Sequence, residues 1–146
     1  MAARELLKYP ETQITLVDLD DQMTELCSTD PMITKLNQGS LTDERVTVIN
    51  MDAYKYLEDC TEKFDVIIVD LPDPNNEALN KLYLNVFYRL CANRLSEGGV
   101  INVQSTSPYY ATRSFWCVNK TLESEGLYVK PYHLQVPAFG DWGFIF

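Results

Sequence analysis

Short apolar runs alternate along the chain with longer segments in which apolar residues recur every three or four positions. The short runs are rich in β-branched residues and are typical of strands, whereas the longer segments are typical of amphipathic helices. Alternation of this kind predicts a parallel sheet with helices on both faces. Strands are expected over residues 13–19, 45–51, 66–69, 100–104, 127–136 and 143–146, and helices over residues 2–9, 21–38, 53–59, 76–97 and 108–125.

Turn and capping residues indicate where several of these elements begin and end. Asp30–Pro31 suits the N-cap and first position of a helix, so residues 21–38 are expected to form two helices. The pair Gly98–Gly99 is expected to end one helix, and Ser107–Pro108 is expected to begin the next.

The last two strands, 127–136 and 143–146, are joined by a loop too short for a helix, so they are expected to pair antiparallel. A mostly parallel sheet with such a C-terminal hairpin is typical of the Rossmann-like, S-adenosylmethionine-dependent methyltransferase-type α/β fold. That fold normally opens with a strand and a glycine-rich turn, and neither precedes the first predicted helix. We therefore expect a single, N-terminally truncated domain over residues 1–146, with the first strand missing.

A missing first strand has a consequence for association, because that strand lies in the middle of this type of sheet. Its two neighbours would each keep one unpaired edge, and unpaired edges readily pair with another chain. The sequence therefore predicts a chain that self-associates into a homo-oligomer or rearranges its sheet.

Composition limits the classes of protein to which the chain can belong. Its 146 residues, 46% hydrophobic and 23% charged, suit one soluble globular domain, and no apolar run is long enough to span a bilayer. The net charge of −9 disfavours nucleic acid as a partner. Cysteines without a CxxC pair and a lone histidine argue against a metal site and against disulfides, and favour a cytoplasmic location. These residues are Cys27, Cys60, Cys91, Cys117 and His133.

Aspartates follow three of the predicted strands at equivalent places. Asp18, Asp52 and Asp70 each lie at or just beyond the carboxyl end of a strand, where open α/β sheets bind ligands. We expect the three carboxylates to converge on one cleft. Asp18 is placed to accept hydrogen bonds from ribose hydroxyls, and Asp52 from an adenine amino group, with Met51 and Ala53 beside the ring. For each aspartate alone, capping of the following helix is the more frequent role.

The segment Asp70–Pro74, D-L-P-D-P, carries two carboxylates directly after a buried strand. Asp70 and Asp73 are either catalytic or cation-binding residues, or they only cap the next helix and shape the turn.

Several segments, in order and spacing, resemble motifs of the spermidine synthase (polyamine aminopropyltransferase) family. Residues 17–20 resemble the family's V-E-I-D, residues 51–57 its G-D-A-x-x-F-L, and residues 70–74 its D-S-S-D-P. Residues 137–144 resemble its closing P-T-Y-P-S-G…G-F, and the whole resemblance covers residues 4–144.

The resemblance implies a transferase of polyamine biosynthesis that moves an aminopropyl group from decarboxylated S-adenosylmethionine to a diamine such as putrescine. It implies that methylthioadenosine is released and that no metal is needed. Asp70 falls on the family's catalytic base and Asp73 on its diamine-binding acid. Gln104 falls on a substrate-contacting glutamine, and Phe139 stands where a substrate-contacting tyrosine is usual.

For the co-substrate, the resemblance assigns the ribose to Asp18 and the adenine to Asp52 and Ala53. Leu71–Pro72 replaces two small polar residues of the family's signature, and this variant is similar to a bacterial branch whose synthase domain is fused to membrane segments. The chain is then expected to be the cytoplasmic part of a longer membrane protein.

Two other functions remain open on the sequence. An ordinary S-adenosylmethionine-dependent methyltransferase would use Asp18 and Asp52 equally well, although the pair Asp70 and Asp73 favours aminopropyl transfer. The missing first strand favours the second alternative, an inactive fragment or a partner-binding domain.

Overall fold

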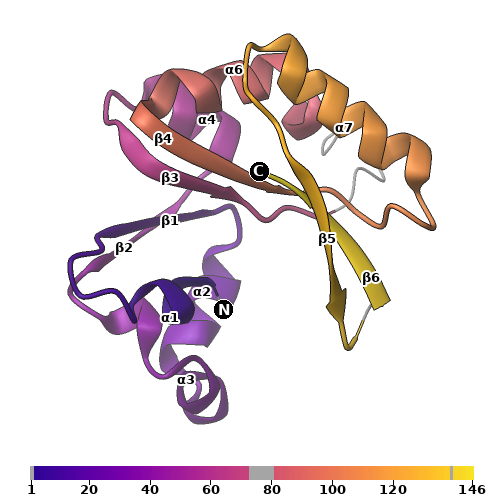
Figure 1. Cartoon of the computed structure of the whole chain (residues 1–146). Helices are drawn as coiled ribbons and strands as arrows, with labels where there is room; N and C mark the ends of the chain where they lie inside the picture. The colour runs from indigo at the N-terminus through magenta and orange to yellow at the C-terminus, as the bar shows by residue number, and fades with distance from the viewer. Residues whose placement is uncertain (1, 73–80, 139) are drawn as a thin grey trace. The chain divides into compact units, whose positions relative to one another are not determined.

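The computed structural model describes residues 2–72, 81–138 and 140–146. The chain divides into two compact units, Met1–Asp59 and Cys60–Phe146, which Figure 1 shows in indigo to magenta and in magenta to yellow. Each unit is described here by itself. The expectation of one domain over residues 1–146 stays a prediction.

The first unit contains a pair of parallel strands and four short α-helices. β1 (Ile14–Asp18) pairs with β2 (Val46–Asn50) in continuous register, from Ile14 opposite Val46 to Asp18 opposite Asn50. The helical elements are α1 (Ala2–Leu6), α2 (Asp21–Thr29), α3 (Pro31–Asn37), the 3₁₀ turn η1 (Ser40–Thr42) and α4 (Ala53–Asp59).

Asp30 separates α2 from α3, as the sequence predicts. Its Oδ1 accepts hydrogen bonds from the backbone N–H groups of Met32 and Ile33 at 2.9 and 3.0 Å. Its extended backbone ends α2, and Pro31 then occupies the first turn of α3. The predicted division into two helices is confirmed.

The second unit contains a four-stranded sheet in the order β3-β4-β6-β5. β3 and β4 are parallel, whereas β6 runs antiparallel to both β4 and β5. The predicted α/β fold, with parallel strand pairs and an antiparallel C-terminal hairpin, is therefore confirmed. The elements are β3 (Phe64–Val69), η2 (Lys81–Tyr83), α6 (Asn85–Arg94), β4 (Leu95–Gln104), α7 (Thr112–Ser124), β5 (Pro131–Val136) and β6 (Gly140–Ile145).

The core of the second unit lies where α6 and α7, side by side in Figure 1, meet the sheet. Burial of apolar side chains from both helices and two strands supplies its main stabilisation. Its most deeply buried members are Phe87, Tyr88, Cys91, Val103, Leu122 and Ile145.

β3 differs from the sequence prediction in its burial. Its apolar run predicts a strand covered on both faces, but Val66 is 52% exposed and Ile68 is 42% exposed. Among the described residues β3 has a strand neighbour on one side only, β4, and β1 likewise pairs only with β2. The expectation that two strands keep an unpaired edge is therefore confirmed for the described residues. Val66 and Ile68 lie two residues apart, so one face of β3 is partly exposed.

The glycine pair lies inside a strand and does not end a helix. α6 ends at Arg94, and β4 begins at once with Leu95 and continues through Gly98–Gly99. Gly98 has a φ of +76°, and the register of β4 against β3 shifts between Phe64 and Val66. The glycines therefore mark an irregularity in the strand, which is another common role for glycine.

The ends of three other elements also differ from the prediction. α7 begins at Thr112, because Ser107–Pro108 forms a separate turn in which the Ser107 hydroxyl accepts from the N–H groups of Tyr109 and Tyr110. β5 begins at Pro131, later than predicted, and β6 begins earlier.

The start of the helix predicted from residue 76 lies outside the described residues. No helix among residues 2–72, 81–138 and 140–146 is long and apolar enough to cross a membrane.

Candidate active site

In the first unit, the two aspartates that follow strands lie at the same edge of the β1–β2 pair. Asp18 is the last residue of β1, opposite Asn50, and its carbonyl oxygen accepts from the N–H of Met51 at 3.1 Å. Asp52 follows one residue later, and both aspartates are half-buried. Parallel pairing thus places Asp18 and Asp52 at the same end of the strand pair.

Both carboxylates also have local structural roles. Oδ1 of Asp18 accepts from the N–H of Asp20 at 2.9 Å, and Oδ1 of Asp52 accepts from the N–H of Tyr54 at 2.8 Å. These bonds shape the turn after β1 and the start of α4, so part of the capping interpretation is correct. A carboxylate can accept about four hydrogen bonds, so a local capping bond is compatible with a second role in binding.

In the second unit, Asp70 and Gln104 lie at the carboxyl ends of adjacent parallel strands. Val69 of β3 is opposite Val103 of β4, so the next residues in each strand, Asp70 and Gln104, reach the same edge of the sheet. Asp70 is exposed, whereas Gln104 is half-buried. Asp70 belongs to a different unit from Asp18 and Asp52, and the convergence of all three on one cleft stays a prediction.

The backbone after Asp70 is held by side chains from two other segments. The Tyr83 hydroxyl of η2 donates to the carbonyl oxygens of Pro72 and Leu71, at 2.8 and 3.2 Å. With its side-chain amide assigned to the orientation that pairs both ends, Gln104 donates to Leu71 O at 2.7 Å and accepts from the indole Nε1 of Trp142 at 2.6 Å. We refer to residues Asp70–Pro72 as the Asp70 turn.

Sequence reasoning missed the contribution of Tyr83 to this turn. Its helical spacing with neighbouring apolar residues is the signal of a core position, and its ring is only partly exposed. A buried tyrosine usually finds a partner for its hydroxyl, which was the available signal, but the sequence does not identify that partner.

Two predicted substrate residues, Asp73 and Phe139, lie outside the described residues.

No group of three or more histidine, cysteine, aspartate or glutamate residues that could hold a metal ion occurs in the described part of the chain. The carboxylates of Asp18, Asp52 and Asp70 are instead suited to accept hydrogen bonds from hydroxyl, amino and ammonium groups.

Comparison with known proteins decides the family. The family model described as the spermine/spermidine synthase domain matches residues 1–146, the whole chain. The chain belongs to this family. A polyamine aminopropyltransferase of Oceanobacillus iheyensis is 49% identical over 146 residues, which are 99% of this chain and 28% of that protein. Polyamine aminopropyltransferase 2 of Ralstonia nicotianae is also 49% identical, over 99% of this chain and 29% of that protein.

Solved structures of the family share the fold. A spermidine synthase in complex with the transition-state analogue AdoDATO matches with a TM-score of 0.87 and 23% identity, over 97% of this chain and 48% of that chain. Spermidine synthase of Thermotoga maritima matches with a TM-score of 0.84, over 97% of this chain and 47% of that chain. The chain thus spans less than a third of the length of the relatives just named and about half the length of these structures.

Proposed function

We propose that the chain contributes the catalytic edge of a spermidine synthase-like transferase of polyamine biosynthesis. The reaction moves the aminopropyl group of decarboxylated S-adenosylmethionine to a diamine such as putrescine and releases methylthioadenosine. The observation that carries this proposal is the exposed carboxylate of Asp70 at the carboxyl end of β3, on a turn that is held by hydrogen bonds. The chain that carries it matches the family over its whole length.

The difficult partner in this reaction is the nucleophile. An alkylamine is mostly protonated near neutral pH, and a protonated amine cannot attack carbon. Asp70 would accept one proton from the diamine ammonium group as the new carbon–nitrogen bond forms. The carbon–sulfur bond breaks in the same displacement, and its electron pair returns to the sulfonium sulfur, giving a neutral thioether. Because the sulfonium is already a good leaving group, no general acid is required.

The other substrate residues would bind and orient the diamine. Asp73 would stabilise its positive charge, and Phe139 would contact its methylene groups. Gln104 uses one amide hydrogen on Leu71, which leaves a second N–H that can orient the diamine.

The co-substrate would lie against the carboxyl edge of the β1–β2 pair. Two half-buried carboxylates at the same end of a strand pair suit a nucleoside, which offers ribose hydroxyls to Asp18 and an adenine amino group to Asp52. Ala53, the first residue of α4, would pack beside the ring. Methyl transfer would need the same nucleoside site, but membership of the spermine/spermidine synthase domain family favours aminopropyl transfer.

Replacing the proposed base tests the reaction. Asp70→Asn keeps the size of the side chain and removes its basicity, so we expect kcat for aminopropyl transfer to putrescine to fall about 10²–10⁴-fold. Asp65→Asn is the matched control, because Asp65 is an exposed aspartate of β3 whose Oδ1 accepts from Ser96, a bond that asparagine can keep. Full activity in Asp70→Asn would contradict the proposed role.

Calorimetric titration of methylthioadenosine tests the nucleoside site without relying on turnover. We expect methylthioadenosine to bind the parent chain. In Asp52→Ala we expect its affinity to fall at least about tenfold, because one or more charge-assisted hydrogen bonds disappear. Glu58→Ala, on the exposed side of α4, is the control. Equal affinity in Asp52→Ala and the parent chain would remove Asp52 from the site.

We also propose that the chain self-associates through unpaired strand edges. β3 carries exposed apolar side chains and has one strand neighbour among the described residues, so its free backbone groups can pair with a second copy. The cytoplasmic location and the membrane segments of a longer parent protein stay predictions.

A further inference from the structure

The side-chain amide of Gln104 joins two parts of the second unit that are distant in sequence. Its Nε2 donates to Leu71 O at 2.7 Å and its Oε1 accepts from Trp142 Nε1 at 2.6 Å, in the amide orientation that pairs both ends. The distance to Leu71 O is that of an ordinary N–H···O hydrogen bond, and the distance to the indole nitrogen is slightly shorter. The amide therefore connects the Asp70 turn with β6.

The Asp70 turn is held from a second side by Tyr83. Its hydroxyl lies 2.8 Å from Pro72 O and 3.2 Å from Leu71 O. A carbonyl oxygen has two lone pairs, so Leu71 O can accept from Tyr83 and Gln104 together. The backbone that carries the Asp70 carboxylate is thus fixed by hydrogen bonds at the two residues that follow it.

β6 is in turn fixed to the end of β4. Gln104 pairs with Phe144 in the antiparallel ladder, and beyond it the N–H of Ser105 donates to Gly143 O at 3.0 Å. The N–H of Gly143 then donates to Thr106 O at 2.7 Å. The indole that precedes Gly143 therefore has a defined position relative to the amide that it contacts.

The backbone at Thr106 shows how tightly this end of β4 is held. Thr106 is buried and has a φ of +59°, a conformation that β-branched residues rarely adopt. Such conformations persist only where surrounding contacts enforce them, and they are frequent at functional sites. Here the enforcing contact is the N–H of Gly143 from β6, so the hairpin orders the strand end that carries Gln104.

We propose that Trp142 is a positioning residue for this site. Through Gln104 it fixes the backbone of the Asp70 turn and thereby the direction of the Asp70 carboxylate. The inference rests on the proposed role of Asp70 as the base. The effect of Trp142 on the turn passes through its hydrogen bond to Gln104. Because misplacement of a base slows the chemical step, loss of Trp142 should lower kcat and leave KM nearly unchanged.

Solvent exchange of the indole protons, measured by NMR, tests the first hydrogen bond of this connection. The chain has two tryptophans, and Trp116 of α7, 47% exposed, is the internal reference. We expect the indole proton of Trp142 to exchange about tenfold faster in Gln104→Met than in the parent chain, with that of Trp116 unchanged. Equal exchange of the Trp142 proton in both chains would overturn the proposal.

Trp142→Phe keeps an aromatic ring but removes the N–H donor together with part of the indole ring system. It tests whether the Asp70 turn changes when the hydrogen bond to Gln104 is lost. We expect the ¹³C resonances of the Leu71 carbonyl and the Asp70 carboxyl to shift, whereas Trp116→Phe, the matched control, leaves both in place. Unchanged resonances in a folded Trp142→Phe chain would overturn the proposal. If that variant does not fold, the solvent exchange of the Trp142 indole proton in Gln104→Met still decides the proposal.

Kinetics separate this proposal from the proposed function. In aminopropyl transfer, Trp142→Phe should lower kcat about tenfold and keep KM within about twofold. When it is added to Gln104→Met, it should lower kcat no further. A full additional loss in the Gln104→Met chain would overturn an effect that passes through Gln104. If Asp70→Asn keeps its full rate, the proposed function fails, and the NMR shifts still decide whether Trp142 positions the turn.

Discussion

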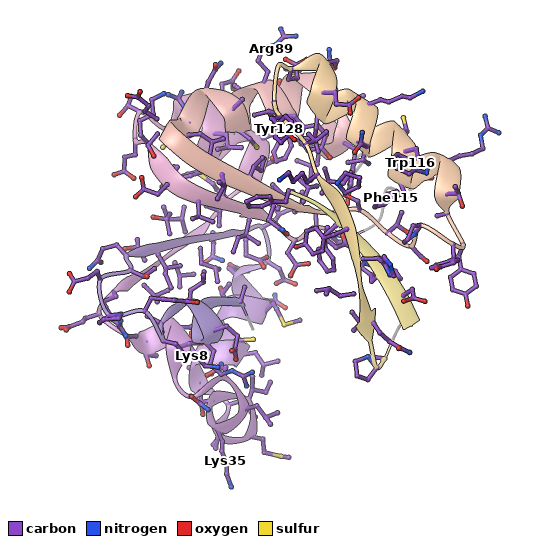
Figure 2. The ribbon with its side chains drawn as sticks, in the orientation of Figure 1. Lys8, Lys35, Arg89, Phe115, Trp116 and Tyr128 are labelled. Carbon is purple, nitrogen blue, oxygen red and sulfur yellow. The ribbon has the colours of Figure 1, made fainter. Side chains whose placement is uncertain are left out.

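At the scale of single residues, a close contact between α7 and β6 decides the identity of one glycine. Phe115 of α7, labelled in Figure 2, is buried with 3% of its surface exposed. A Cβ at Gly143 would overlap Cε2 of this ring and would lie 2.9 Å from the carbonyl oxygen of Thr106. Since a backbone atom and a buried ring both block the space, no side chain fits at Gly143 without displacement of the hairpin.

We therefore expect Gly143→Ala to lower the free energy of unfolding by about 1–3 kcal/mol, the usual cost of overpacking a core. Urea denaturation followed by circular dichroism measures it. Phe115→Leu should lower stability by itself. In that background Gly143→Ala should cause a smaller further loss than in the parent chain, because the leucine side chain leaves room for the methyl group. Additive losses in the double variant would show that the ring is not the obstacle.

At the scale of elements, an ion pair ties α6 to the C-terminal end of α7. Arg89, labelled in Figure 2, donates through Nε to Glu125 Oε2 at 2.7 Å and through Nη2 to Oε1 at 3.3 Å. The side chain of Glu125 is only 7% exposed. The hydrogen bond from Arg89 lowers the pKa of Glu125 below its ordinary value of 4.5.

This lowered pKa predicts how stability depends on pH. A carboxyl with a lower pKa in the folded chain stabilises it fully above its ordinary value of 4.5, and the contribution is lost as pH falls through the folded pKa. We expect Glu125→Gln to be less stable than the parent chain at neutral pH, and the difference to shrink steadily below about pH 4.5. Chemical denaturation over this pH range measures the difference. A difference that stays constant at acid pH would contradict the prediction, and Glu97→Gln, at an exposed position of β4, is the control.

At the scale of the whole molecule, the described strands form two separate sheets with open edges. β1 and β3 each pair with one strand, and Val66 and Ile68 of β3 are exposed. Proteins usually protect such edges with charges, proline or covering segments, because exposed apolar edges pair with other chains. Two chains that each carry a net charge of −9 repel one another at low salt, and physiological salt screens much of this repulsion.

We expect the chain to associate with increasing concentration in sedimentation velocity experiments at physiological salt. Ile68→Lys places a charge on the exposed side of β3 and should shift the chain toward the monomer by at least about tenfold in dissociation constant. Leu84→Lys, at an exposed position before α6, is the matched control and should not change the dissociation constant. A parent chain that is monomeric at high concentration would exclude association through this edge.

Local signals in the sequence determined the element types, the division at Asp30, the antiparallel closing hairpin and the family, because each depends on neighbouring residues or on motif spacing. They also determined that Asp18, Asp52 and Asp70 follow strands, since strand ends are local features. The local partners of Asp18 and Asp52 agree in part with the capping roles expected from the sequence, whereas the distant side chains that hold the Asp70 turn were not available from it.

Only the tertiary structure decided how the Asp70 turn is held, because Tyr83, Gln104 and Trp142 reach it from elements distant in sequence. The same is true of Gly98, whose strand position depends on the register of β4 against β3. The exposure of Val66 and Ile68 likewise depends on what packs against their face of β3. Hydrogen-bond partners, register and cover are properties of long-range pairing, and local periodicity carries little information about them.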